Sequence, residues 1–194
     1  MNQIPEDRLA AHVHALRDRP LAKATRERMA QALLDWFTAG WAALDMPATP
    51  TLQALARTCV PGDGPSPVFG GGALQPLAAG FANAGIAHLR EIDDAHRAAM
   101  LHPGVVAISP VLALGATHKM PMRRVADAII AGYEVALRVG EVLGTRHAAH
   151  FHATATAGAV LVATVSLRWP SHSSIPSKPA SLARRAAWTP PPLS

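Results

Sequence analysis

Two short segments of the sequence concentrate the side chains that could do acid–base chemistry. The first segment contains His88, Glu91, Asp93, Asp94, His96 and His102. The second contains His147, His150 and His152. Both segments lie at junctions between apolar stretches, where side chains from different helices can project into a shared cleft. These nine residues are therefore the first candidates for a catalytic or binding site.

His102 is the most informative single position. Pro103 follows it, and proline suits the first position of a helix because its missing N–H is not needed there. We therefore expect His102 at or beside the N-cap of a helix. The N–H groups and positive dipole end at such a helix start favour an anion, such as a substrate carboxylate. The same field disfavours imidazolium, so His102 is a candidate for a neutral base; the alternative is a capping or surface histidine.

The two adjacent acids and the second histidine group each allow two interpretations. Asp93 and Asp94 could orient a histidine or handle protons, or they could be solvated or helix-capping acids. Three nearby histidines with carboxylates would suit zinc or iron in principle. However, the spacing of His147, His150 and His152 is not HExxH and no cysteine joins them. We therefore assign no metal ligand.

Two other kinds of site are disfavoured. The only serines before residue 166 are Ser66 and Ser109, and neither lies in a GxSxG motif, which argues against a Ser-His-Asp site. The glycine-rich segment 61–72, PGDGPSPVFGGG, lacks the pattern of a phosphate-binding loop and is expected to be a loop.

The hydrophobic pattern predicts an all-α fold, an irregular packed array of helices rather than a coiled coil. No segment shows sustained period-two alternation. One apolar stripe on the second expected helix includes Trp36, Phe37 and Gly40, and Gly115 and Gly144 are expected to end later helices. The expected helices cover residues 9–16, 24–44, 51–59, 75–90, 103–114 and 122–143, with another opening at 154–165.

The charge of the chain is unevenly distributed. The 194 residues carry a formal net charge of +5. The segment 166–194 is rich in serine, proline and arginine, and its four basic residues and lack of acids account for all but one of these net charges. We interpret residues 1–165 as an incomplete helical domain and 166–194 as a tail that is disordered or read out of frame. The nearly neutral body gives no reason to expect a nucleic-acid partner.

Composition also limits the setting of the protein. Cys59 is the single cysteine, which excludes a disulfide scaffold and fits a reducing compartment. The start of the sequence does not resemble a signal peptide, and the longest apolar run, 157–165, is too short to span a membrane. The sequence therefore predicts a cytoplasmic protein without membrane contact.

Three segments in order resemble the MmgE/PrpD family, which includes 2-methylcitrate dehydratase, cis-aconitate decarboxylase and iminodisuccinate epimerase. They are AAGFANAGIAHLREIDDAHRAAMLHPGVVAISPVLALGA (78–116), AIIAGYEVALRVGEVLG (128–144) and HFHATATAG (150–158). The resemblance covers roughly residues 1–165. It implies the N-terminal part of a large all-α domain that is joined to a smaller α/β domain, in an enzyme that is usually a homodimer. It also implies cofactor-independent proton transfer next to a carboxylate of a small di- or tricarboxylate, followed by loss of water or CO2 or by inversion at carbon.

The resemblance assigns roles to individual residues. His102 matches the histidine of the family's HP motif and is implied as the acid/base, with Asp93 and Asp94 as further catalytic groups. Glu91 and His152 are implied as substrate-binding residues, and we place His88 and His96 with them. Ala95 and Ala153 depart from the threonine and the proline that are common in the family, which weighs against a strict decarboxylase site.

Length is the largest departure from the family. Members are more than twice as long, and the lysine that binds substrate carboxylates lies beyond the point where this chain departs; Lys178 does not match it. We therefore expect little or no turnover by the 194-residue chain. The alternatives are a non-catalytic helical module that self-associates through exposed apolar faces or, with less support, a metal enzyme that uses the histidine cluster.

Overall fold

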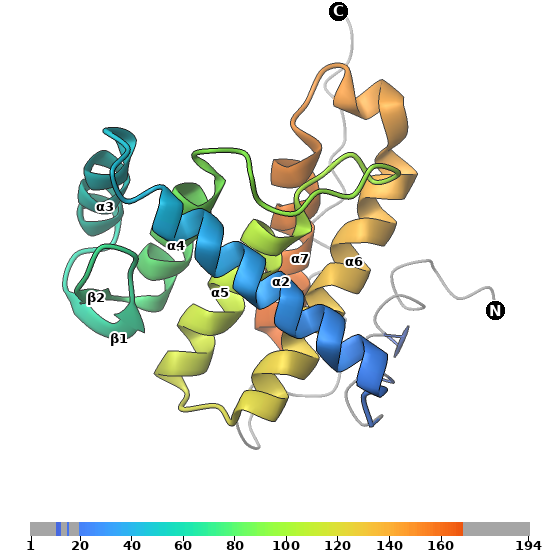
Figure 1. Cartoon of the computed structure of the whole chain (residues 1–194), viewed down its shortest axis with the longest axis horizontal. Helices are drawn as coiled ribbons and strands as arrows, with labels where there is room; N and C mark the ends of the chain where they lie inside the picture. The colour runs from blue at the N-terminus through green and yellow to red at the C-terminus, as the bar shows by residue number, and fades with distance from the viewer. Residues whose placement is uncertain (1–10, 13–14, 16–19, 169–194) are drawn as a thin grey trace, which may run out of the picture.

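The computed structural model describes residues 11–12, 15 and 20–168 (Figure 1). Most of the expected first helix over 9–16, and the segment 169–194, lie outside the described residues. The described elements are α2 (Lys23–Ala42), α3 (Ala48–Cys59), β1 (Asp63–Pro67), β2 (Ala73–Leu74), α4 (Pro76–His88), α5 (Pro103–Thr117), α6 (Met122–Ala148) and α7 (Ala153–Arg168). The mainly helical fold that the sequence predicts is therefore confirmed.

Helix α5 lies at the centre of the domain. It packs against α4, α6 and α7, and α2 crosses over it (Figure 1). Its sequence explains this central position, because α5 has apolar and small residues on all of its sides and most of them are buried. The helix begins at Pro103, as expected, but it does not end at Gly115. Gly115 is buried inside α5, and a Cβ there would lie 3.1 Å from Cγ2 of Val125, so this glycine permits the close approach of α6.

The predicted loop over 61–72 contains a short antiparallel hairpin that the sequence analysis missed. β1 and β2 pair with an irregular register, and Gly70, Gly71 and Gly72 take positive φ angles in the connection. Several hydrogen bonds attach the hairpin to the helices: for example, the Ser66 hydroxyl donates to the Ala113 carbonyl at 2.7 Å, and the Asn83 amide donates to the Pro67 carbonyl at 2.9 Å. Because both strands are short and β1 contains proline, they leave no period-two pattern to detect.

Helix α2 buries a narrower face than its pattern indicates. Trp36, Ala39 and Gly40 are buried, whereas the Phe37 side chain is half exposed, contrary to the expected stripe. A Cβ at Gly40 would overlap the ring of Phe69, so glycine lets the hairpin connection pack directly on the helix. The Trp36 indole donates to the Ser109 hydroxyl at 2.9 Å, which ties α2 to the buried centre of α5.

The end of α6 places the second histidine segment. Gly144 has φ +63° and ψ −171°, so the helix breaks at the glycine that the sequence marks as its end, and helical geometry then resumes as far as Ala148. A short turn leads to α7, so His147 lies in the last turn of α6 and His152 immediately precedes α7. None of the helices in the described part of the chain combines the length and apolar character needed to cross a membrane.

Candidate functional site

The segment between α4 and α5 carries most of the predicted site residues. It crosses from the end of α4 to α6 (Figure 1). There, Ala99 and Leu101 lie so close to Gly140 of α6 that a side chain at position 140 would overlap them. The His96 N–H donates to the Leu101 carbonyl at 2.9 Å, and the Ala99 N–H donates to Nδ1 of His96 at 3.2 Å. His96 therefore shapes this segment, and its predicted contact with substrate stays a prediction.

A buried carboxylate brings two of the predicted histidines together. Nδ1 of His88 lies 3.0 Å from Oδ1 and 3.1 Å from Oδ2 of Asp93. Nδ1 of His102 lies 3.2 Å from Oδ2 of the same carboxylate. The Asp93 side chain is 1% exposed, whereas those of His88 and His102 are 24% and 26% exposed. The carboxylate thus lies beneath two imidazoles that solvent can reach, and we call these three residues the His–Asp–His cluster.

His102 occupies the N-cap of α5, as the sequence predicts. Its backbone is extended, with φ −102° and ψ 95°, and its side chain makes no capping hydrogen bond. The His102 N–H donates to the Thr154 hydroxyl at 3.0 Å, which connects the start of α5 to α7. Nδ1 of His102 is buried and has no hydrogen-bond partner in the described residues, because the contact with Asp93 lies outside hydrogen-bonding angles.

The anion at the start of α5 comes from the protein itself. Oδ1 of Asp94 accepts the Gly104 N–H at 2.9 Å, and Oδ2 accepts the Tyr133 hydroxyl at 2.8 Å. Burial raises the pKa of the Asp94 carboxyl, and these two hydrogen bonds oppose part of the rise. Since Pro103 has no N–H, the Gly104 group is the first donor of the helix, and it is already occupied. A substrate carboxylate at this helix start would therefore need a donor other than the Gly104 N–H, and its binding there stays a prediction.

The second histidine segment is only partly brought to the cluster. The His152 ring centroid lies 5.8 Å from that of His88, whose ring is 4.8 Å from that of His102. His147 instead bonds the Thr156 hydroxyl at 3.0 Å and stacks on Phe151, and His150 is exposed. In the described part of the chain, the group close enough to share a metal ion is His88, Asp93 and His102, and not the three histidines of the second segment.

In the part of the chain that the structure describes, no side-chain hydrogen bond or ion pair joins Glu91 to the His–Asp–His cluster. It is exposed and takes a left-handed backbone conformation, with φ +50°, at the turn that follows α4. Its predicted role in substrate binding therefore rests on the family resemblance and stays a prediction.

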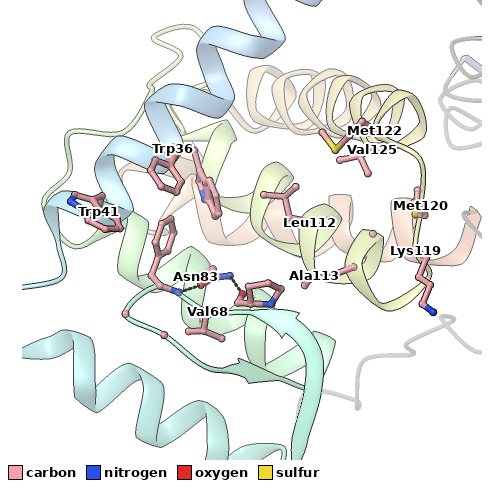
Figure 2. Close-up of a pocket in the computed structure, with 17 residues that line it drawn as sticks. Trp36, Trp41, Val68, Asn83, Leu112, Ala113, Lys119, Met120, Met122 and Val125 are labelled. Atoms are coloured by element: carbon pink, nitrogen blue, oxygen red, sulfur yellow. Dashed lines mark hydrogen bonds between the residues drawn. The ribbon is translucent and has the colours of Figure 1, made fainter.

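A large apolar pocket lies apart from the acid–base groups (Figure 2). It has a volume of about 660 Å³, and its lining includes the contacting rings of Trp36, Phe37, Trp41 and Phe69. Lys119 is the one charged residue in its lining, and none of the predicted site residues borders it. The sequence carried a signal for this pocket in the closely spaced Trp36, Phe37 and Trp41, but we assigned two of them to the core. The pocket can bind apolar surface, but it lacks the groups for proton transfer.

Together, the fold and the cluster define a mainly helical domain that holds histidines and carboxylates around one helix start. Residues 7–168 match the MmgE/PrpD N-terminal domain, so the chain belongs to the MmgE/PrpD family. A search of curated proteins gave no match.

Proposed function

We propose that this domain serves a lyase or isomerase that moves a proton next to a carboxylate of a small di- or tricarboxylate, as a 2-methylcitrate dehydratase does. Family membership supports the general class of protein. The single observation that carries the proposal is the Asp93 carboxylate between the Nδ1 atoms of His88 and His102. A carboxylate in contact with Nδ1 orients an imidazole and leaves Nε2 for the substrate.

In this proposal, His102 is the base. Its buried Nδ1 faces Asp93, so the exposed part of the ring presents Nε2 to the substrate. Nε2 takes the proton from the carbon beside a substrate carboxylate. In a dehydration, the C–H electron pair forms the new double bond while the C–O bond breaks, and the departing hydroxyl group takes the proton held by His102 and leaves as water. His88 and His152 lie close enough to His102 to help bind the substrate carboxylates.

We assign different tasks to the two adjacent aspartates. Asp93 positions the imidazoles, because it contacts both of them. Asp94 positions the start of α5, because its two oxygens hold the Gly104 N–H and the Tyr133 hydroxyl. Neither oxygen of Asp94 is free to handle a substrate proton without loss of one of these contacts, so we propose a positioning role in place of the predicted catalytic one.

Hydrogen exchange at carbon tests the proposed proton transfer more sensitively than complete turnover. The chain is incubated with 2-methylcitrate in D2O, and NMR follows deuterium uptake beside the carboxylates. We expect slow uptake above the uncatalysed rate, and a loss of about 100-fold or more in His102→Gln because the base is removed. His150→Gln is the matched control, since it removes an exposed imidazole outside the cluster. Failure of both citrate and 2-methylcitrate to shift the ring resonances of His88 and His102, together with no deuterium uptake, would contradict the proposal.

A further inference from the structure

The His–Asp–His cluster also has the composition of a metal site. We propose that His88, Asp93 and His102 bind one divalent transition-metal ion of the Zn²⁺ class, and that the bound ion inhibits proton transfer. The binding depends only on the three side chains, whereas the inhibition rests on the proposed function. The site is thus a point of control on a reaction that itself needs no metal.

The donor atoms and their distances carry this inference. One ligand atom from each residue lies within 4.8 Å of the other two, and the carboxylate lies 3.0 Å and 3.2 Å from the two Nδ1 atoms. Zinc binds imidazole nitrogen and carboxylate oxygen at about 2.0–2.2 Å, which places neighbouring ligands roughly 3 Å apart. Two histidines with one carboxylate are a ligand set that zinc uses in catalytic sites, where the fourth position stays open. Small side-chain rotations would therefore complete the site.

A second, independent feature is the unpaired nitrogen of His102. Its Nδ1 is buried and makes no hydrogen bond in the described residues, although it lies 3.2 Å from the Asp93 carboxylate. A buried polar atom without a partner destabilises the folded protein, because its hydrogen bonds to water are lost and not replaced. A cation between the ring and the carboxylate would satisfy the nitrogen and would also pair with the buried charge of Asp93. The ion-pair partners that the structure gives Asp93 are the two histidines of the cluster.

The same geometry explains why a bound ion inhibits. The ion takes the position between Asp93 and the two Nδ1 atoms, so the carboxylate no longer orients the imidazoles by direct contact. A neutral His102 ring that coordinates the ion through Nδ1 carries its proton on Nε2, so Nε2 has no lone pair with which to accept a substrate proton. His152, whose ring lies 5.8 Å from that of His88, or a water molecule can take the open fourth position.

Metal binding to the purified full chain tests the site. The protein is prepared without a histidine tag, stripped with EDTA and titrated with Zn²⁺ by calorimetry and with Co²⁺ by visible absorption. We expect one tightly bound metal ion per chain. The His88→Gln and His102→Gln variants should each bind the ion at least about tenfold more weakly. His150→Gln should bind as the unchanged protein does. Circular dichroism checks the fold of each variant, and His88→Gln provides a second test of the site should His102→Gln unfold.

Two results would overturn the metal site: affinities within twofold of the unchanged protein in both cluster variants, or an equal loss in His150→Gln. Inhibition is measured separately, as slower deuterium uptake with Zn²⁺ that EDTA reverses. Tight binding without any deuterium uptake would count against the proposed function alone. Deuterium uptake without metal binding would count against the metal site alone.

Discussion

The Asp94 carboxylate caps the central helix of the domain, because its Oδ1 accepts the Gly104 N–H at 2.9 Å. The same carboxylate accepts the Tyr133 hydroxyl from α6, and the Asp94 N–H donates to Oδ2 of Asp35 on α2. Three helices thus meet at one partly buried acid. Asp93 adjoins Asp94, and His102 lies two residues before Gly104. The contact between Asp94 and Gly104 therefore also holds the His–Asp–His cluster in place.

Replacing Gly104 with alanine should disturb this junction. An added Cβ would lie 2.5 Å from Oδ1 of Asp94 and 3.0 Å from the Tyr133 hydroxyl oxygen, so one of these groups must move. We expect Gly104→Ala to lower the free energy of unfolding by about 1–3 kcal/mol in urea denaturation. Gly80→Ala, within α4, is the matched control, since its Cβ would lie at an ordinary contact distance of 3.5 Å from Cα of Pro110 in α5. The control should be neutral or more stable by up to about 1 kcal/mol, and equal losses in both variants would contradict the steric explanation.

The raised pKa of Asp94 predicts a pH dependence of stability with a definite sign. Burial raises this pKa in the folded protein above the ordinary value of 3.8, so the folded state holds the proton more tightly than the unfolded chain. The contribution of Asp94 to stability is therefore fully present below pH 3.8 and is lost as the pH rises through the folded pKa. In urea denaturation from pH 4 upward, Asp94→Asn should remove this decline.

Asp45→Asn provides the control for the pH experiment. The hydrogen bond and charge of Arg90 lower the pKa of Asp45, so its titration lies below 3.8 and leaves the slope above pH 4 unchanged. The interpretation fails if Asp94→Asn keeps the slope of the unchanged protein, or if Asp45→Asn alters it.

The sequence predicted the parts of the site that depend on local rules. Pro103 marked the helix start and therefore placed His102 at the N-cap, and Gly144 marked the break in α6. The family resemblance drew on the order of several motifs, so it did not depend on the exact ends of any helix. The proline, the glycine and each single motif are signals that lie within a few residues along the chain.

The errors concern contacts between distant segments. The capping of α5 by Asp94 depends on a turn that reverses the chain between α4 and α5, and no pattern encodes that turn. His147 was grouped with His152 by spacing, but the break at Gly144 directs it to Thr156. Gly115 looked like a helix end because glycine often ends helices, whereas here it serves the packing of α5 against α6. In each case the sequence was compatible with more than one role for the residue, and tertiary packing determined which role it has.

The bond between Trp36 and Ser109 should contribute measurably to stability. The indole N–H donates to the Ser109 hydroxyl at 2.9 Å, and both residues are buried. Ser109→Ala leaves that N–H without an acceptor, so we expect a loss of about 1–3 kcal/mol in urea denaturation. With Trp36→Phe already present, the same change should cost less, because no donor remains to be paired. Additive losses in the double mutant would show that the hydrogen bond contributes little.

The tautomers of two histidines should be opposite, which tests the geometry of the site directly. Nδ1 of His88 lies 3.0 Å and 3.1 Å from the two oxygens of Asp93, and an ionised carboxylate only accepts, so neutral His88 must carry its proton on Nδ1. Nδ1 of His96 accepts the Ala99 N–H at 3.2 Å, so its proton must be on Nε2. Long-range ¹H–¹⁵N spectra of the neutral rings distinguish these forms, and His96 is the internal control. Asp93→Asn should release His88 towards the Nε2–H form while His96 stays unchanged. A His88 ring that is protonated on Nε2 in the unchanged protein would remove the basis for the orienting role of Asp93.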